Sequence, residues 1–351
     1  MVTEINFNAP CNVLGYGIAA SNLLQALSEN AKVNLWPIGP IGAASEKLQK
    51  SAQKSLDNSL TADFSQPTIK VWHQNQLIDR PGRGKYYGFP IFELDNFTPA
   101  ELLSLSCPHE LIVCSKWAKT VLSNFISQPI HVVPLGIDTE LFYPSQNENT
   151  GPYKFFNVGK WELRKGHDVL VECFNRAFDL NDDVELHMMC ENPFLQPEQI
   201  ANWHALYKNS DLGDKIYIHN RVNTHIEVAD FMRSMDCGVF ISRAEGFNLD
   251  LLEAMSVGAQ VIATNYSAHT EFCTPDNTNL VDVQDLEPAN DGIWFHGQGN
   301  WAYIGEAQKE QTIEHMRYCY KNRICNKAGV LSGRQYTWTN SADGILNVIS
   351  N

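Results

Sequence analysis

Short apolar runs alternate with amphipathic segments along the first part of this chain. Strands are expected at the runs INFNA, KVNLWPIG, TIKVWH, YYGFPIFE, HELIVCS and IHVVPLG, because each is short, apolar and bounded by polar or turn-forming residues. Helices are expected over residues 18–28 and 117–125, and the polar stretch at about 43–66 is expected to hold a further helix and a loop. Strands that alternate with helices favour a parallel α/β sheet.

The same alternation starts again after a break. Residues 138–144 and the cluster SQNENTGP that follows lack the pattern, and this cluster is expected to be a linker. Beyond it, strands are expected at YKFFNVG, VELHMMC, KIYIHN, CGVFIS and AQVIAT. Helices are expected between them over residues 166–178, 197–209, 225–235 and 249–257. Two such runs indicate two doubly wound domains, whose ligand-binding strand ends would form a deep cleft if they faced each other.

Composition and charge favour a soluble protein that binds neither nucleic acid nor a membrane surface. The 351 residues are 44% hydrophobic and 19% charged, which is enough apolar material for two cores. The net charge of −14, without a long Lys/Arg run, repels phosphate backbones and anionic lipids. No apolar stretch approaches the length of a membrane span, and the start MVTEINFNAP does not fit a signal peptide.

The cysteines point to a reducing compartment. Nine are scattered along the chain without a Cys-x-x-Cys pair, so neither a zinc site nor a dithiol redox motif is indicated. Most of them stand in apolar strings, where buried free thiols are expected. We therefore expect a cytoplasmic protein.

The segment SRAEGFNLDLLEAMSVG, residues 242–258, is the first candidate for chemistry. Asn248 can cap a helix that begins at Leu249, and the unpaired N–H groups of the first helical turn suit a diphosphate. Glu245 stands just before this helix and Glu253 about one turn inside it. That spacing can place one carboxylate beside a sugar and the other beside a ribose. On the pattern alone, a loop charge and a solvated helix residue are an equally good interpretation.

The segment FFNVGKWELRKGHDVLV, residues 155–171, is the second candidate. It predicts a strand, a basic turn with Lys160, Arg164 and Lys165, and a helix. Cations opposite a helix N-terminus can neutralise a departing diphosphate without a metal. A solvated basic turn is the alternative interpretation.

Together these segments resemble a known family. EGFNLDLLEAMSVGAQVIATNYSAHTEF is similar to the E-x7-E signature of retaining glycosyltransferases of the GT-B fold, in the large family four, also called glycosyl transferases group 1. The resemblance implies two Rossmann-like domains facing each other across a cleft, with Glu245 at the donor sugar and Glu253 at the ribose hydroxyls. The implied contacts to the rest of the nucleotide are Phe247, Asn248 and Leu249 at the helix start and Lys160, Arg164 and Lys165 in the basic turn.

In the basic turn, Lys160 and Lys165 match the positions with which the family grips the diphosphate. The family more often has Arg at the first position, so Arg164 is a second candidate for that contact. Lys165 is expected to act in catalysis. The other main glycosyltransferase fold holds a divalent ion with an Asp-x-Asp triplet, and this sequence has none. A metal is therefore not expected.

The first half carries weaker candidates. Gly15 and Gly17 formally satisfy G-x-G-x-x-A, but no acid follows about twenty residues on, which excludes the nicotinamide interpretation. The resemblance instead implies that these glycines lie over the donor phosphates and the acceptor. His73, which follows an apolar run, is expected to be catalytic, although a structural histidine is equally compatible with its position.

Further residues are implied by the resemblance with less weight. Glu93 and Asp95 follow another apolar run, near the expected sugar or acceptor, and Arg221 stands where the family approaches the nucleotide base. The segment PLGID closes the last strand of the first domain, so Gly136 and Asp138 are expected to be structural hinge residues.

The resemblance also implies the domain ranges. Domain one is expected over 1–147 and domain two over 148–324, while 325–351 is expected to cross back to domain one. The segments DGIWFHGQGNWAYIGEAQKEQTIEHMRYCYKN and QYTWTNSADGILNVIS are expected to form a loop followed by two helices.

The expected function is retaining, metal-independent transfer of a sugar from a nucleoside-diphosphate sugar of the UDP, GDP or ADP type to a hydroxyl acceptor, without a bound cofactor. A sugar-nucleotide epimerase, a phosphorylase and a non-catalytic sugar-nucleotide-binding protein are the alternatives. A phosphorylase would require pyridoxal phosphate on a lysine, and no clear lysine is found. A DNA base as acceptor is disfavoured by the acidic balance. The sequence identifies neither the base, the sugar, the acceptor nor the oligomeric state.

Overall fold

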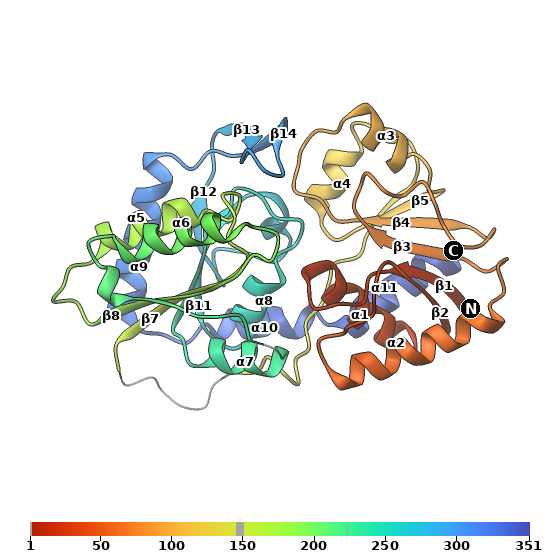
Figure 1. The fold of residues 1–351 in the computed structure, drawn as a ribbon, viewed down its shortest axis with the longest axis horizontal. Coiled ribbons are helices and arrows are strands. Elements are labelled where there is room, and N and C mark those ends of the chain that lie inside the picture. Colours follow the sequence, from red (N-terminus) through yellow and green to blue (C-terminus); the bar gives the residue numbers. More distant parts are fainter. Residues whose placement is uncertain (1, 145–150, 223) are drawn as a thin grey trace. The chain divides into compact units, whose positions relative to one another are not determined.

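The computed structural model describes residues 2–144, 151–222 and 224–351 (Figure 1). Most of the linker expected at SQNENTGP lies outside these residues, and so does the domain boundary expected between 147 and 148.

Contacts divide the chain into two compact units. Unit one contains the residues up to Asp138 together with Tyr336–Asn351, and unit two contains Thr139–Gln335. The chain therefore enters unit two once and returns to unit one near its end. The domain ranges expected from the sequence, 1–147, 148–324 and 325–351, remain a prediction.

Unit one is built on a parallel sheet. Among the described residues the sheet has the strand order β2-β1-β3-β4-β5-β6, and every neighbouring pair runs parallel. The strands are β1 (Glu4–Ala9), β2 (Lys32–Pro37), β3 (Thr68–Trp72), β4 (Tyr86–Pro90), β5 (Glu110–Val113) and β6 (Ile130–Val132). The helices are α1 (Gly15–Leu27), α2 (Glu46–Asn58), α3 (Pro99–Leu105), α4 (Lys116–Leu122) and α11 (Trp338–Ser350), with a 3₁₀ turn η1 (Ser59–Thr61).

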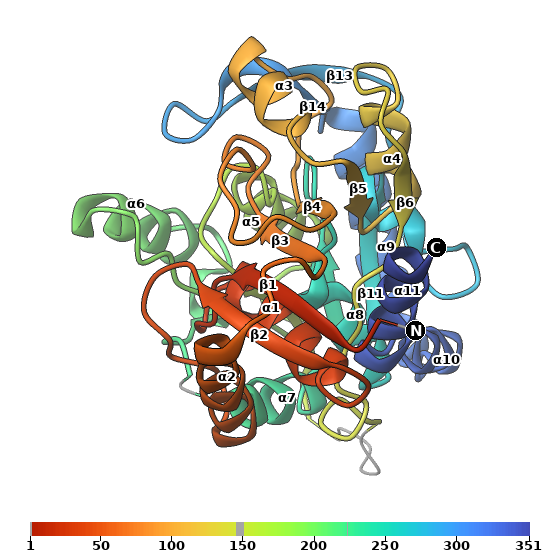
Figure 2. The same cartoon turned by 90° about the vertical axis from the view of Figure 1, so that its right-hand side faces the viewer.

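Helix α11 completes unit one from the far end of the sequence. It packs on α1, and the two helices lie side by side near β1 in Figure 2. The Ser341 hydroxyl donates to the Pro134 carbonyl at 2.7 Å, and Ile137 bridges to Thr337. Gly136 permits this approach, because a Cβ built on it would lie 2.1 Å from the Thr337 carbonyl carbon.

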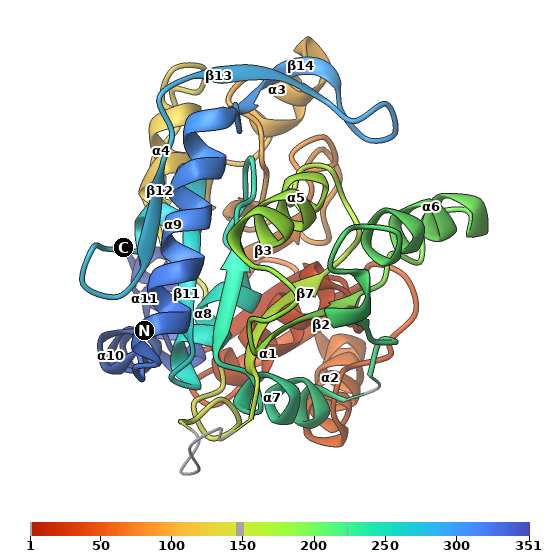
Figure 3. The same ribbon diagram turned by 90° about the vertical axis from the view of Figure 1, so that its left-hand side faces the viewer.

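Unit two repeats the architecture. Its described strands have the order β12-β11-β10-β7-β8-β9, all parallel, and Figure 3 shows α9 running along β11 and β12. The strands are β7 (Tyr153–Gly159), β8 (Val184–Cys190), β9 (Ile216–Ile218), β10 (Cys237–Phe240), β11 (Gln260–Asn265) and β12 (Asn279–Asp282). The helices are α5 (His167–Ala177), α6 (Pro197–Lys208), α7 (His225–Arg233), α8 (Leu249–Ser256), α9 (Glu306–Asn322) and α10 (Lys327–Gln335), with 3₁₀ turns η2 (Gly213–Lys215) and η3 (Ser267–Glu271).

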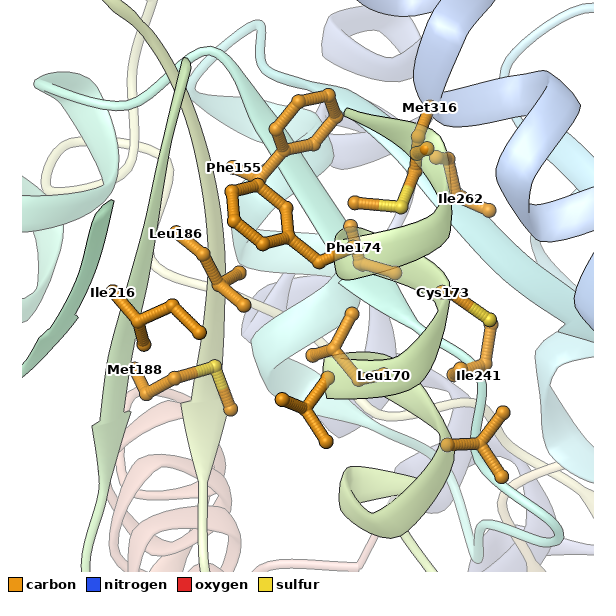
Figure 4. Packing of buried hydrophobic residues seen from close by; sticks show 14 of the residues in the cluster. Phe155, Leu170, Cys173, Phe174, Leu186, Met188, Ile216, Ile241, Ile262 and Met316 are labelled. Carbon is orange, nitrogen blue, oxygen red and sulfur yellow. The ribbon is translucent and has the colours of Figure 1, made fainter. Parts of the chain in front are cut away.

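The core of unit two lies between its sheet and the α5–α9 layer (Figure 4). Phe155 of β7 and Leu186 of β8 pack with Leu170 and Phe174 of α5 and with Met316 of α9, and all five are buried. Each such side chain contributes about 1.5–3 kcal/mol when it leaves water. This core fixes the strand ends on which the candidate site is built.

The expected α/β fold with two Rossmann-like parallel sheets is confirmed, with local corrections. The segment DGIWFHGQGNWA was expected to be a loop, but it completes an antiparallel hairpin of β13 (Leu286–Asn290) and β14 (His296–Ala302). Its Gly, Gln and Asn residues hide the strand pattern, and the pairing partner stands earlier in the sequence. The C-terminal segment holds α9, α10 and α11 where two helices were expected, and α3 was not expected.

The buried free thiols expected at most of the cysteines are confirmed. All cysteines are free thiols, and most are buried, with Cys107 and Cys325 exposed. None of the helices in the described ranges combines the length and the hydrophobicity that crossing a bilayer requires.

Candidate active site

The loop between β10 and α8 carries the first motif. Asn248 caps α8 in the left-handed region (φ 76°, ψ 73°), which Asn tolerates better than most residues, and its side-chain oxygen accepts from the Leu251 amide at 3.3 Å. The first-turn amides of α8 have no acceptor within the helix, so this end can receive an anion.

A neutral histidine holds the cap in place. His269, in η3, is fully buried, and burial lowers the pKa of its ring to about 4. Its Nδ1 donates to the Thr264 carbonyl at 3.0 Å, which leaves Nε2 to accept from the Asn248 amide nitrogen at 2.9 Å. The Asn248 side chain is therefore fixed at both ends, and the loop is pre-organised.

The turn between β7 and α5 carries the second motif. Gly166 has a φ of 73° and lies so close to β10 that a Cβ on it would be 2.2 Å from the Ile241 carbonyl oxygen. Inside the turn, His167 accepts from the Glu162 amide at 3.3 Å, and burial together with the Lys165 charge lowers the pKa of His167 to about 3. This glycine brings the basic turn against the end of β10.

We expect Gly166→Ala to lower the midpoint of thermal unfolding. The left-handed backbone and the contact with a carbonyl oxygen together cost at least about 2 kcal/mol. Gly42→Ala is the matched control, since nothing lies within 4 Å of a Cβ at Gly42 and its φ is not positive. Equal midpoints for the two variants would contradict this account of the turn.

The two motifs meet in a row of alternating charges, which we call the charge chain: Lys160, Glu162, Arg164, Glu245, Lys165 and Asp250. Lys160 Nζ lies 2.8 Å from Glu162, and Arg164 bridges Glu162 at 2.7 Å and Glu245 at 2.8 Å. Lys165 Nζ lies 3.0 Å from Glu245 and 3.9 Å from Asp250. The interior members are buried, whereas the side chains at the ends, Lys160 and Asp250, are 41% and 32% exposed.

The Glu245 carboxylate accepts hydrogen bonds on both of its oxygens. Its Oε1 accepts from Lys165 and from the Ser242 hydroxyl, and its Oε2 accepts from Arg164. Burial alone would raise the pKa of Glu245, but the Arg164 and Lys165 charges outweigh it and hold the pKa well below the ordinary value. A carboxylate offers about four acceptor positions, so Glu245 can still accept a ligand hydroxyl.

Lys165 stays charged in the same environment. Burial alone would lower the pKa of its ammonium group, but the Glu245 and Asp250 charges raise it above its ordinary value. Burial alone would likewise raise the pKa of Glu162. The Arg164 and Lys160 charges outweigh this effect and lower the pKa to about 2. The charge chain is therefore ionised at neutral pH along its buried part.

Arg243 connects this site to the β13–β14 hairpin. Its guanidinium pairs with both Asp168 oxygens at 2.8 and 2.9 Å, donates to the Leu163 carbonyl at 2.6 Å and reaches Glu287 of β13 at 3.1 Å. A partly buried bidentate pair of this kind is geometrically specific. Arg243 thus fixes the basic turn and the hairpin to the end of β10.

The structure places the other expected residues of unit two as follows. Glu253 is buried within α8, and Leu249 begins that helix. The Phe247 ring is buried against Phe272 at 5.2 Å, so Phe247 offers its backbone and not its ring to a ligand. Arg221 is exposed in the segment that follows β9.

The expected residues of unit one lie in α1 and in the segments after β3 and β4. Gly15 begins α1, and Gly17 is buried in the same helix, where a Cβ would lie 2.3 Å from the Asn12 side chain. Gly17 therefore has a structural reason to be glycine. His73 is exposed directly after β3 and packs against the Tyr16 ring at 4.4 Å. Glu93 and Asp95 lie in the loop after β4.

Several residues of the site were missed by the sequence analysis. Glu162 and Asp250 stand inside the quoted motifs, but spacing alone does not show that they pair with lysines. Ser242 and Arg243 begin the first motif and His269 follows it, but no contact of their side chains can be read from the spacing. The available signal was the group of charged residues that SRAEG and KWELRKG each place directly after an apolar run. Charged residues in such a position are rarely buried unless they are paired.

The fold is shared with solved glycosyltransferases of the GT-B class. Sucrose-phosphate synthase from Thermosynechococcus elongatus superposes with a TM-score of 0.70 at 16% identity, over 99% of this chain and 98% of that one. The Anabaena protein Alr3699/HepE in complex with UDP-glucose superposes with a TM-score of 0.71 at 14% identity, over 99% of both chains. The two units therefore have the GT-B fold.

Residues 152–293 match the sequence profile of the family described as glycosyl transferases group 1, and the resemblance found in the sequence is confirmed over this segment. The MMP alpha-(1->4)-mannosyltransferase of Mycolicibacterium hassiacum is 26% identical over 62% of this chain and 49% of its own length. The matched part of the chain thus spans about half or less of the length of these curated relatives.

Proposed function

We propose that this protein is a glycosyltransferase that moves a sugar from a nucleoside-diphosphate sugar to a hydroxyl acceptor, with retention of anomeric configuration. The observation that carries the proposal is the meeting of Glu245, Lys165 and the N-terminus of α8 in one buried cluster. The family match covers this segment, and related folds have been solved with UDP and UDP-glucose. Since the matched proteins are transferases, we carry neither the epimerase nor the non-catalytic alternative forward.

In the proposed site the donor diphosphate lies at the first turn of α8. The helix N-terminus and the charged Lys165 stabilise the negative charge that develops as the diphosphate leaves, and Lys160 assists from its exposed position. Because these are fixed cations and dipoles, the proposed reaction needs no divalent metal.

Glu245 is assigned to the donor sugar as a hydrogen-bond acceptor. A carboxylate with its pKa held low and its oxygens hydrogen bonded is a poor base and a poor nucleophile, but it orients a sugar hydroxyl well. We propose that the leaving diphosphate oxygen takes the proton of the acceptor hydroxyl, which attacks from the same face. The protein then contributes positioning and charge stabilisation.

A panel of nucleotide sugars with different bases tests the donor class. Stability against heat is measured with each one, and a donor at a hundred times its dissociation constant adds about 2.7 kcal/mol to the free energy of unfolding. Stabilisation by UDP-, GDP- or ADP-sugars supports the proposal. No stabilisation by any of them would remove it.

Glu253→Ala is expected to weaken nucleoside diphosphate binding by about 1.5–3 kcal/mol, because the ribose hydroxyl pair loses a charged acceptor. Titration calorimetry with the bare nucleoside diphosphate measures this loss. Glu271→Ala, an acid of η3 in the same unit, is the matched control and should bind as the wild type does. Unchanged affinity of Glu253→Ala would take Glu253 out of the site.

A further inference from the structure

The cations of the proposed diphosphate site are already paired with carboxylates of the same chain. Lys160 is held by Glu162 at one end of the charge chain, and Lys165 is held between Glu245 and Asp250 at the other. Three of the six members have cationic side chains and three are carboxylates, and burial raises the pKa of one of these carboxylates, Asp250, above its ordinary value. A diphosphate that reaches this site therefore meets a neutral cluster and not a surplus of positive charge.

Asp250 lies where the proposed function places the donor diphosphate. It lies in the first turn of α8, where the helix dipole and the open amides stabilise a negative charge, and its carboxylate is 3.9 Å from Lys165. Its side chain is 32% exposed, so it can swing away without disturbing the core. Glu162 is different, since it is buried and also holds Arg164, but it competes for Lys160 in the same way.

We propose that the Asp250 and Glu162 carboxylates compete with the donor diphosphate for its cations. When no nucleotide is bound, Asp250 pairs with Lys165 and Glu162 pairs with Lys160. This competition weakens the binding of the nucleoside diphosphate product. The inference rests on the proposed function and deepens it, because it assigns the tuning of product release to residues of this chain. When the diphosphate departs, the carboxylate pairs with its lysine again. This pairing raises the rate of product release. Neither carboxylate touches the reacting atoms in this proposal, so both are positioning residues.

Titration calorimetry of the full chain with UDP, GDP and ADP tests this, with the isosteric variants Asp250→Asn and Glu162→Gln. Asp250→Asn is expected to tighten the dissociation constant of the nucleotide that binds by at least about fivefold, because one negative charge beside the diphosphate is removed. Glu162→Gln is expected to tighten it less, since the lysine that it frees, Lys160, has a side chain that is 41% exposed and its charge is screened by solvent. The gain should shrink as salt is raised, as Coulomb terms do at a partly exposed site.

Glu172→Gln is the matched control, because it removes the same charge on α5 from a pair with Lys309 and Arg176 outside the site. It should bind within about twofold of the wild type. Product inhibition in a turnover assay supplies the second readout, in which the inhibition constant of the nucleoside diphosphate falls by the same factor in Asp250→Asn, while a purely structural role would raise it. A thermal melt reports whether each variant is folded.

The outcomes separate this inference from the proposed function. Binding by the wild type without a gain in Asp250→Asn, or an equal gain in Glu172→Gln, overturns the inference and leaves the proposed function standing. If neither the wild type nor the variants bind any of the three nucleotides, the proposed function falls and the inference falls with it. Binding that is tighter only in Asp250→Asn and Glu162→Gln supports both.

Discussion

Lys165→Ala is expected to reduce turnover by about 10²–10³-fold, a loss that added magnesium or manganese does not restore. The expectation follows from the position of Lys165 Nζ, which is buried and charged beside the first turn of α8. Removing one fixed group that stabilises developing negative charge costs about 2.7–4 kcal/mol of transition-state stabilisation. Added metal ions should not replace the lost ammonium group, because the proposed site uses fixed cations and binds no metal ion.

The measurement is initial rate with saturating donor and acceptor, with and without excess EDTA. The wild type should keep its full rate in EDTA. Lys309→Ala, which removes an ammonium group from α9 paired with Glu172, is the control and should keep wild-type turnover. Wild-type activity that disappears on chelation and returns with manganese would contradict the metal-independent account.

Glu245→Gln is expected to reduce turnover by about 10²-fold or more while binding of the bare nucleoside diphosphate is kept or strengthened. The amide keeps the shape of the side chain but weakens the hold on a sugar hydroxyl. At the same time it leaves Arg164 and Lys165 without their shared counter-charge, which favours an anion. Turnover should therefore fall while the affinity for the bare nucleotide does not.

Steady-state kinetics and titration calorimetry on the same preparation separate the two effects. Glu253→Ala supplies the comparison, since it should lose nucleotide affinity. If both variants lost the affinity for the bare nucleotide equally, the assignment of Glu245 to the sugar and Glu253 to the ribose would be wrong. A melt of Glu245→Gln is needed as well, because uncompensated buried charges also lower stability.

The fold could be predicted because its strands are short apolar runs, each followed by a helical pattern. The strands expected at YKFFNVG and VELHMMC have the same bounds as β7 and β8. The hairpin of β13 and β14 could not be predicted in this way. Its alternation is interrupted by glycines, and its attachment through Glu287 to Arg243 depends on a residue more than forty positions away in the sequence.

The site could be predicted only as far as its motifs name residue types. The spacing of Glu245 and Lys165 in two separate segments gave no sign that they pair at 3.0 Å, because that pairing depends on β7 and β10 being neighbours in the sheet. Arg164 was expected as a possible contact of the diphosphate, and the structure shows its guanidinium between Glu162 and Glu245. Tertiary packing, and not local pattern, decides which charge meets which.

The position of α11 has a consequence for synthesis on the ribosome. Unit one includes residues from both ends of the chain, and α1 is covered by α11 only after unit two has been made. The part of α1 that α11 covers therefore stays open through the translation of about 200 intervening residues, while α2 and the sheet can already pack on the rest of the helix. Because unit two is continuous in sequence, it can fold while that part of α1 is still open. We therefore expect unit two to become protease-resistant first on stalled nascent chains, with unit one following only when the segment that contains α11 has left the exit tunnel.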